Sequence, residues 1–202
     1  MHCLWIDLFR KLVIEVNVYD FDNTIYKRDS AKSFYLFVIK RHPSILFRSL
    51  PRQIVSLVKY KLRKISKEEF KSIYFSFIQH INVAQEINAF IEIEKHNIAQ
   101  WYLDQKQMTD VIISASPEFI VRPFMEKFDI ENVIASKVDD KTGNFVSRNC
   151  YGEEKVKRFK KMYSTEKIDN FYSDSLTDLP LAQLAKSAYM VRGEKLKLWD
   201  FR

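Results

Sequence analysis

The chain has few of the residues that build loops or span membranes, and these scarcities limit the fold. Three glycines and five prolines in 202 residues argue against a loop-rich all-β protein. No apolar run approaches the ~20 residues that a membrane-spanning helix needs, and the longest candidate is the short segment SFYLFVI. Because 47% of the residues are hydrophobic, a substantial core is expected, in one domain with or without a small inserted one.

Cysteine and histidine are too few for the common disulfide and zinc frameworks. Cys3 and Cys150 give no disulfide pattern and no metal-ligand spacing. The four histidines form no H-x-x-x-H pair, which disfavours a zinc hydrolase. The N-terminal stretch MHCLWIDLFRKLVIE lacks the order of charge, apolar core and cleavage site of a signal peptide. We therefore expect a reducing, cytoplasmic location.

Positive charge is concentrated in one window of the chain. Between Lys40 and Lys71, ten Lys or Arg residues accompany only Glu68 and Glu69, a local balance of +8 against +7 for the whole chain. Three interpretations are open: a solvated helix face whose apolar stripe fills a cap core, a surface that attracts an anionic substrate, and an amphipathic helix in peripheral contact with an anionic membrane. No nucleic-acid reader motif occurs, so nucleic acid is not an expected partner.

The first half of the chain predicts one strand followed by helices. VIEVNVYD is typical of a buried strand that ends at Asp20. Asp29 or Ser30 is placed to cap the first helix, and the segment SKEE (66–69) forms a capping box for a later one. Apolar residues between Leu46 and Leu62 recur at the spacing of one helix face. The segment from AQEINAF to WYLDQK predicts a further helix.

The second half alternates strands with helices. DVIISAS, NVIASKV, FVSRN, KIDNFYSDS and SAYMVRG predict strands, with a turn at DDKTGN. SPEFIVRPFMEKF predicts a helix with Ser116 as its N-cap, and EEKVKRFKKMY and DLPLAQLAK predict two more. This order predicts an α/β fold, a Rossmann-like parallel sheet with a helical cap inserted after the first strand. The expected core is residues 1–27 and 106–202, and the expected cap is residues 28–105.

Polar side chains gather where the predicted strands end, which is the edge at which open α/β sheets bind ligands. Asp20, Asp22, Ser114 and Asp174 follow the predicted strands, Asp178 comes four residues after Asp174, and Lys155 opens the helix between these segments. Several carboxylates in one place require a cation, and hard oxygen ligands favour Mg²⁺. A serine hydroxyl, an ammonium group and the free amides of a helix start suit a phosphate. The pattern predicts a Mg²⁺-assisted phosphoryl-transfer site.

Four short motifs, in this order, resemble those of the haloacid dehalogenase-like superfamily. DFDNT is similar to its D-x-D-x-T signature, and VIISAS to its second motif. Lys155 in CYGEEKV matches the third motif, and YSDSLTD the D-x-x-x-D form of the fourth. The helical insert resembles the cap of the phosphoserine phosphatase-like branch. The resemblance covers residues 16–192.

The resemblance implies a Mg²⁺-dependent phosphatase that forms an aspartyl-phosphate. Asp20 would be the nucleophile, and Asp22 the general acid and then the base. The residues that would bind phosphate are Thr24, Ser114, Ala115 and Lys155. The residues at the metal would be Asp20, Asp22, Asp174 and Asp178. Asp22 would bind through its backbone carbonyl, and Asp178 would either support the metal's direct ligands or position Lys155.

Each of these residues also has an ordinary structural interpretation. A D-x-D after a strand is commonly a turn feature, a lysine among other lysines is commonly on a solvated helix face, and Asp178 is placed to cap the helix that follows it. It is the four motifs together that favour catalysis.

The expected substrate is a small phosphorylated molecule. Asp29 is the candidate for specificity in the cap, where phosphoserine phosphatases carry an acid that meets the substrate ammonium. The alternatives are a membrane-surface phosphatase that acts on a phospholipid precursor such as phosphatidylglycerol phosphate, and a non-catalytic phosphate-binding module of the same fold.

Overall fold

A computed structural model describes residues 16–163 and 168–200 of the chain. The expectations for the N-terminal stretch 1–15, Cys3 included, lie outside the described residues.

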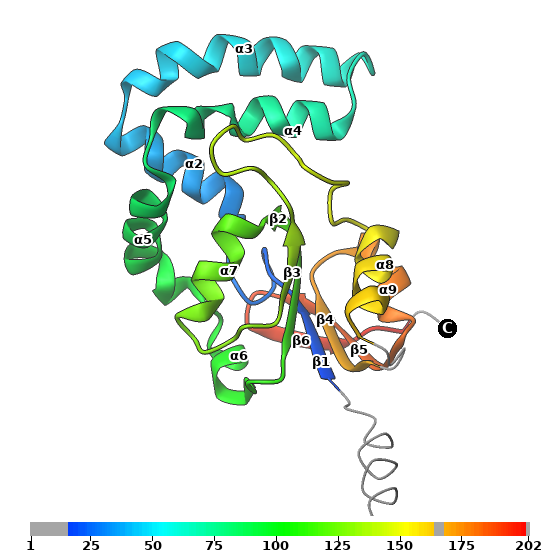
Figure 1. Cartoon of the computed structure of the whole chain (residues 1–202). Coiled ribbons are helices and arrows are strands. Elements are labelled where there is room, and N and C mark those ends of the chain that lie inside the picture. The colour runs from blue at the N-terminus through cyan, green and yellow to red at the C-terminus, as the bar shows by residue number, and fades with distance from the viewer. Residues whose placement is uncertain (1–15, 164–167, 201–202) are drawn as a thin grey trace, which may run out of the picture.

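One twisted sheet carries the strands of the described residues (Figure 1). The strands are β1 (Val16–Asp20), β2 (Val111–Pro117), β3 (Val133–Ser136), β4 (Ile168–Ser173), β5 (Ala185–Arg192) and β6 (Lys195–Leu198). Their order is β3-β2-β1-β4-β5-β6, with β1 to β5 parallel and β6 antiparallel to β5. The predicted α/β class with a Rossmann-like parallel sheet is therefore confirmed, and β6 is a strand that the sequence analysis missed.

The chain between β1 and β2 is helical. It contains α2 (Ser30–Arg41), α3 (Ser44–Lys61), α4 (Lys67–Phe75), α5 (Val83–Glu94) and α6 (Gln100–Gln105), with 3₁₀ turns at Ser76–His80 and Lys95–Asn97. In Figure 1, α2, α3 and α4 lie beyond the end of the sheet, and α3 is the outermost of them. We retain the division into a core (1–27 and 106–202) and a cap (28–105) as a proposal.

The remaining helices cover the two faces of the sheet. They are α7 (Glu118–Glu126), α8 (Glu153–Met162) and the short α9 (Leu179–Ala182). In Figure 1, α7 lies on one side of the sheet and α8 and α9 lie on the other. Tyr19 belongs to the core cluster on the α7 side, whereas Val16 and Val18 belong to the cluster on the α8 side. This is the period-two alternation of a strand that is buried on both faces.

The predicted strand at FVSRN is wrong. Only one isolated bridge, between Val138 and Phe145, forms there. The backbone N–H of Phe145 donates to Ser72 Oγ in α4 at 3.1 Å instead of to a strand partner. This segment therefore contacts the helical insert rather than extending the sheet.

Two predicted helix boundaries are also wrong. Ser116 does not cap α7, because it lies within β2 and its hydroxyl is bound elsewhere; the N-cap is Pro117, which offers no side-chain acceptor. The single helix expected from Ala84 to Lys106 is broken by the 3₁₀ turn, after which Ala99 N donates to Ile25 O at 2.7 Å. That bond ties the end of the insert to the loop after β1.

Glycine is required where the loop after β3 meets α4. Gly143 has φ of +79°, and a Cβ built there would lie 2.5 Å from the carbonyl oxygen of Phe75, the last residue of α4. Close by, Gln79 Nε2 donates to Thr142 O at 2.8 Å. A residue with a side chain at position 143 would force this contact apart.

The interpretation of the apolar stripe between Leu46 and Leu62 as part of a cap core is wrong. In α3 the buried residues are Ile45, Ser49, Gln53 and Ser56. Most of the apolar stripe faces solvent, including Ile54 and Val58. Among the described residues, no helix combines the length and the apolar composition needed to cross a membrane.

Candidate active site

The alternation along β1 directs Asp20 toward α8. Val16 and Val18 pack on the α8 side of the sheet, and Asp20 follows two residues later at the carboxyl end of the strand. The residue is 7% exposed. An acid in this position needs a partner, because an unpaired buried carboxylate is strongly destabilising.

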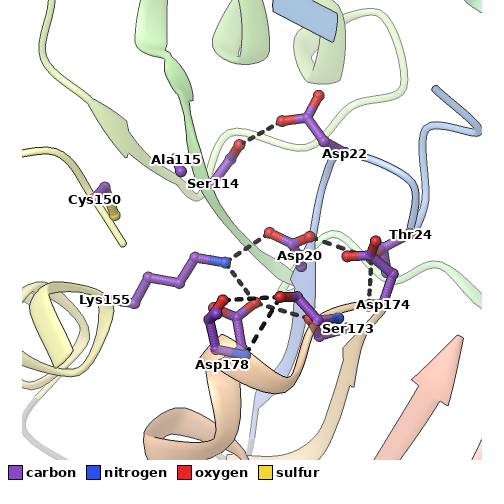
Figure 2. A network of polar contacts seen from close by, with 12 residues as sticks. Asp20, Asp22, Thr24, Ser114, Ala115, Cys150, Lys155, Ser173, Asp174 and Asp178 are labelled. Carbon is purple, nitrogen blue, oxygen red and sulfur yellow. Dashed lines mark hydrogen bonds and ion pairs between the residues drawn. The ribbon is translucent and has the colours of Figure 1, made fainter. Parts of the chain in front are cut away.

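Lys155 provides that partner from the first turn of α8. Its Nζ lies 2.7 Å from Asp20 Oδ1 and 2.7 Å from Asp178 Oδ2, so one ammonium bridges two carboxylates (Figure 2). Ser173 Oγ also donates to Asp178 Oδ2, at 2.8 Å. Asp178 thus holds Lys155, and its carboxylate makes no side-chain cap of α9. Lys155 is buried, which contradicts the solvated-face interpretation. Asp178 does occupy the N-cap position of α9, but its carboxylate binds Lys155 instead of the helix backbone.

Thr24 connects Asp20 to the end of β4. Its hydroxyl donates to Asp20 Oδ2 at 3.2 Å and accepts from the backbone N–H of Asp174 at 3.0 Å. Both bonds are drawn in Figure 2. Arg192 of β5 donates to the carbonyl oxygen of Asp174. The half-buried Asp174 therefore lies beside Asp20 at the same edge of the sheet.

Asp22 belongs to a second, adjacent network. Its Oδ2 accepts from Ser114 Oγ at 3.2 Å and from Ser116 Oγ at 2.5 Å, and its Oδ1 accepts from Ser30 N at 2.6 Å. In Figure 2 the Asp22 carboxylate points toward Ser114 and away from Lys155. The structure thus separates the acids of the D-x-D pair, placing one against a cation and the other among hydroxyl groups.

A further cation, which the sequence analysis missed, reaches this edge from the helical insert. Lys71 of α4 donates from Nζ to Ala115 O at 3.2 Å and to Asn149 Oδ1 at 2.9 Å. Ser136 Oγ donates to the same carbonyl of Ala115 at 3.0 Å. Lys71 lies within the basic window, but nothing in its local pattern distinguishes it from the exposed lysines around it. Ser116 and Ser173, whose hydroxyl groups bind Asp22 and Asp178, were also missed, because nothing in the local sequence distinguishes them from other serines.

Asp29 caps α2. Its Oδ1 accepts from Lys32 N at 2.8 Å, and the residue is exposed. The next residue, Ser30, donates its backbone N–H to Asp22. The specificity candidate thus lies one residue from a direct contact with the site.

The ionisable groups have shifted pKa values because they are buried close together. Burial raises the pKa of Asp20 to about 7; Lys155 acts in the opposite direction, and Asp178 and Asp22 add to the rise. Burial also raises the pKa of Asp22, against its bonds to Ser116 and Ser30. Burial by itself would lower the pKa of Lys155, but the two carboxylates outweigh burial and raise it, so this lysine stays charged.

The donor set can be tested against Mg²⁺. Among residues 16–163 and 168–200, no three Asp, Glu, His or Cys side chains form a ready metal cluster. Asp20 and Asp174 do lie together on one edge, and Lys155 is shared between Asp20 and Asp178, which leaves negative charge in excess. Mg²⁺ typically binds one or two carboxylates and completes its shell with water and phosphate oxygens. Asp20, Asp174 and the backbone carbonyl of Asp22 are suitable ligands for such an ion. Asp178 already binds Lys155 and Ser173, so it is better placed to hold Lys155 than to bind the metal directly.

The chain belongs to the haloacid dehalogenase-like hydrolase family, whose model matches residues 18–183. The predicted family is therefore confirmed, and the matched span contains every residue of the two networks except Arg192.

Individual relatives agree with this assignment. The chain is 25% identical to a histidinol-phosphatase of Neisseria meningitidis serogroup C (strain 8013), over 86% of this chain and 88% of that protein. Its fold is similar to that of a protein of unknown function from Bordetella pertussis Tohama I, with TM-score 0.69, 17% identity and coverage of 86% and 88%. It is also similar to a phosphoserine phosphohydrolase-like protein from Francisella tularensis subsp. tularensis SCHU S4, with TM-score 0.54, 15% identity and coverage of 87% and 86%. The family and the histidinol-phosphatase relative support a phosphoric monoester hydrolase, and the two solved structures agree in fold.

Proposed function

We propose that the protein is a Mg²⁺-dependent phosphatase that hydrolyses a small phosphomonoester through an aspartyl-phosphate on Asp20. The observation that carries this proposal is the position of Asp20, at the end of β1 between the ammonium of Lys155 and the hydroxyl of Thr24. A carboxylate held by two donors is fixed for in-line attack on phosphorus. The hydrolase family of the chain supports the same chemistry.

In the first step a carboxylate oxygen of Asp20 bonds to phosphorus, and the bond from phosphorus to the substrate oxygen breaks. Asp22 gives its proton to the leaving oxygen. Its raised pKa supports this role, because a buried acid keeps its proton more readily at neutral pH. Lys155 offsets the charge that gathers on the phosphoryl oxygens. Ser114, which donates to Asp22, exchanges that partner for a phosphate oxygen.

In the second step Asp22, now ionised, takes a proton from water as the water oxygen attacks phosphorus. The bond to Asp20 breaks, and phosphate and the free carboxylate are regenerated. Bound Mg²⁺ would supply charge neutralisation at the phosphoryl group, held by Asp20, Asp174 and the carbonyl of Asp22. Asp178 keeps Lys155 in place throughout, since their atoms are 2.7 Å apart.

For the substrate we propose a small phosphomonoester that carries a cationic group. The exposed Asp29 at the edge of the site and the histidinol-phosphatase relative support this class. The panel to test is histidinol phosphate, phosphoserine and phosphatidylglycerol phosphate, compared at equal concentration with release of phosphate as the readout.

The mechanism is tested by Asp20→Asn, with Asp140→Asn, an exposed acid outside the site, as matched control. Hydrolysis of an aryl phosphate should fall to background in Asp20→Asn and stay at the wild-type rate in the control. EDTA should abolish turnover, and added Mg²⁺ should restore it. Turnover of Asp20→Asn near the wild-type rate would refute the mechanism.

Two alternative functions, a membrane-surface phosphatase and a non-catalytic phosphate-binding module, predict different results in these assays. The exposed basic and apolar surface of α3 favours a membrane-surface phosphatase, which the panel addresses through phosphatidylglycerol phosphate. A non-catalytic phosphate-binding module predicts that the protein with Mg²⁺ binds phosphate yet turns over neither the panel nor the aryl phosphate.

A further inference from the structure

The helix α3 is oriented with its polar side inward. Its buried residues are Ile45, Ser49, Gln53 and Ser56, three of which are polar. Helices of water-soluble domains ordinarily bury the apolar face instead. The orientation of α3 is therefore a property that needs a physical explanation.

Specific contacts hold the inward side in place. Gln53 Oε1 accepts from the Tyr35 hydroxyl at 2.7 Å, and Gln53 Nε2 donates to Tyr74 O at 2.9 Å. Near the C-terminal end of α3, the rings of Tyr60 and Phe70 are stacked with centroids 5.0 Å apart. These contacts with α2 and α4 fix the rotation of α3 about its axis. The opposite face is thereby directed to solvent.

That opposite face is predominantly apolar, with the exposed Lys61 on it at the C-terminal end of α3. Phe47 is 85% exposed, Ile54 53% and Leu62 61%. We call the set the α3 stripe; it consists of Phe47, Leu50, Ile54, Val55, Leu57, Val58 and Leu62. At ~100° per residue these positions lie on one side of the helix. A contiguous exposed apolar strip of this kind marks an interaction surface.

Basic residues flank the α3 stripe, and the helix has no acidic residue. Arg48, Arg52 and Lys59 are exposed and lie along one border of the stripe, and Arg63 and Lys64 follow its end. The window 40–71 carries a balance of +8. This combination of a narrow apolar face and a cationic border is typical of helices that lie in the headgroup region of anionic membranes.

We propose that the α3 stripe is a docking surface for the anionic phospholipid surface of a membrane, with α3 lying in the plane of that surface. Figure 1 shows α3 as the outermost helix, so a flat surface can approach it. The apolar side chains enter the acyl boundary, and the flanking arginines and lysines bind lipid phosphates. A second copy of the chain fits less well, because pairing two α3 helices brings two strongly positive windows together.

Sedimentation with vesicles tests this proposal without any substrate, so its outcome is independent of catalysis. The probes are vesicles of phosphatidylcholine with or without about 30% phosphatidylglycerol. The stripe variant is Ile54→Ser/Val58→Ser. The matched control is Ile93→Ser on α5, since Ile93 is 55% exposed and lies outside α3.

The wild type should sediment with the anionic vesicles and remain in solution with the neutral ones. The stripe variant should lower the ratio of bound to free protein about tenfold or more, and Ile93→Ser should leave it unchanged. Raising salt from about 0.05 M to about 0.5 M should release the protein, because the electrostatic attraction is screened. Circular dichroism should show that all variants are folded.

Three results would overturn the proposal. The first is no sedimentation with anionic vesicles at low salt. The second is equal binding by the stripe variant and the wild type. The third is a dimer in analytical ultracentrifugation that the stripe variant abolishes while no variant binds vesicles, in which case the α3 stripe faces a second copy.

Discussion

At the carboxyl edge of the sheet, ionisable side chains lie inside the protein, whereas along α3 apolar side chains lie outside it. Asp20, Lys155 and Asp178 are almost wholly buried, and each has a charged partner within 2.7 Å. On α3 the inward Gln53 is hydrogen-bonded while the neighbouring Ile54 is open to solvent. Both places reverse the usual distribution of polar and apolar groups. Such departures are expected where function competes with stability.

The buried charges at the sheet edge and the exposed apolar residues of α3 differ in how far each side chain relies on its neighbours. The buried charges depend on one another, so removing one leaves another without a partner. The exposed apolar residues of α3 keep much of their surface in solvent, so removing one should leave the fold intact. Mutations should therefore have large effects on stability at the first region and small effects at the second.

The largest effect is expected for Lys155→Met, which removes the cation between two buried carboxylates. The free energy of unfolding should fall by ~3–5 kcal/mol, because two acids then face each other without compensation. Aryl phosphatase turnover should fall by at least ~10²-fold. Urea unfolding and initial rates measure the two effects. The control is Lys157→Met, an exposed lysine two residues later, which should change neither.

Asp110, at the start of β2, sharpens the comparison because it is buried with no ion pair among the described residues. Burial raises its pKa to about 6, and the hydrogen bond from Gln107 N acts in the opposite direction. Between about pH 4 and about pH 6 this carboxyl keeps in the folded state a proton that it has lost in the unfolded state, so the contribution of Asp110 to stability falls as pH rises.

Asp110→Asn should remove this contribution, which amounts to ~3 kcal/mol, and leave those of Asp20 and Asp22 in place. Urea unfolding of wild type and variant from pH 4 to pH 7 measures it. The exposed Asp104→Asn serves as control. Parallel pH profiles for wild type and Asp110→Asn would contradict the prediction.

Gln53→Ala should have an intermediate effect. It leaves the Tyr35 hydroxyl and the carbonyl of Tyr74 without their partner, at a cost of ~1–3 kcal/mol in unfolding free energy. Thermal and urea unfolding measure the loss. The exposed Arg52→Ala is the control on the same helix. If both variants were equally stable, the inward contacts of α3 would not fix its orientation.

The smallest effect is expected for Ile54→Ser. An exposed isoleucine contributes little to folding, so the free energy of unfolding should change by no more than ~0.5 kcal/mol. Ile45→Ser on the buried side of the same helix should cost ~2–5 kcal/mol. A large loss for Ile54→Ser would mean that the α3 stripe is covered within the protein itself.

Local patterns along the sequence were enough to locate most elements. The capping box at Ser66 and Glu69, and the cap of α2 by Asp29, form as predicted, because both depend on residues three apart in the chain. The ends of β1 and β4 were also predictable, since apolar runs stop there at acids. The order of the four motifs predicts that Asp20, Lys155 and Asp178 share one site, and these three side chains do lie together.

The predictions that were wrong concern residues whose hydrogen-bond partners lie far away in the sequence. Ser116 has the sequence of a helix cap, yet its hydroxyl binds Asp22, 94 residues away. Phe145 has the sequence of a strand residue, yet its N–H binds Ser72 of α4. The spacing of apolar residues in α3 predicted an apolar face, but it did not predict which face of the helix packs against the rest of the protein. That is decided by Tyr35 and Tyr74, which lie outside α3.

Gly143 has a consequence for how closely the helical insert approaches the sheet. Its missing side chain lets the loop after β3 lie directly against the carbonyl end of α4, and Gln79 joins the same loop a short distance away. Lys71, on that same α4, contacts the carbonyl of Ala115. A side chain at position 143 would push α4, and with it Lys71, away from the carboxyl edge of the sheet. One of the chain's three glycines therefore sets how near the helical insert comes to the candidate site.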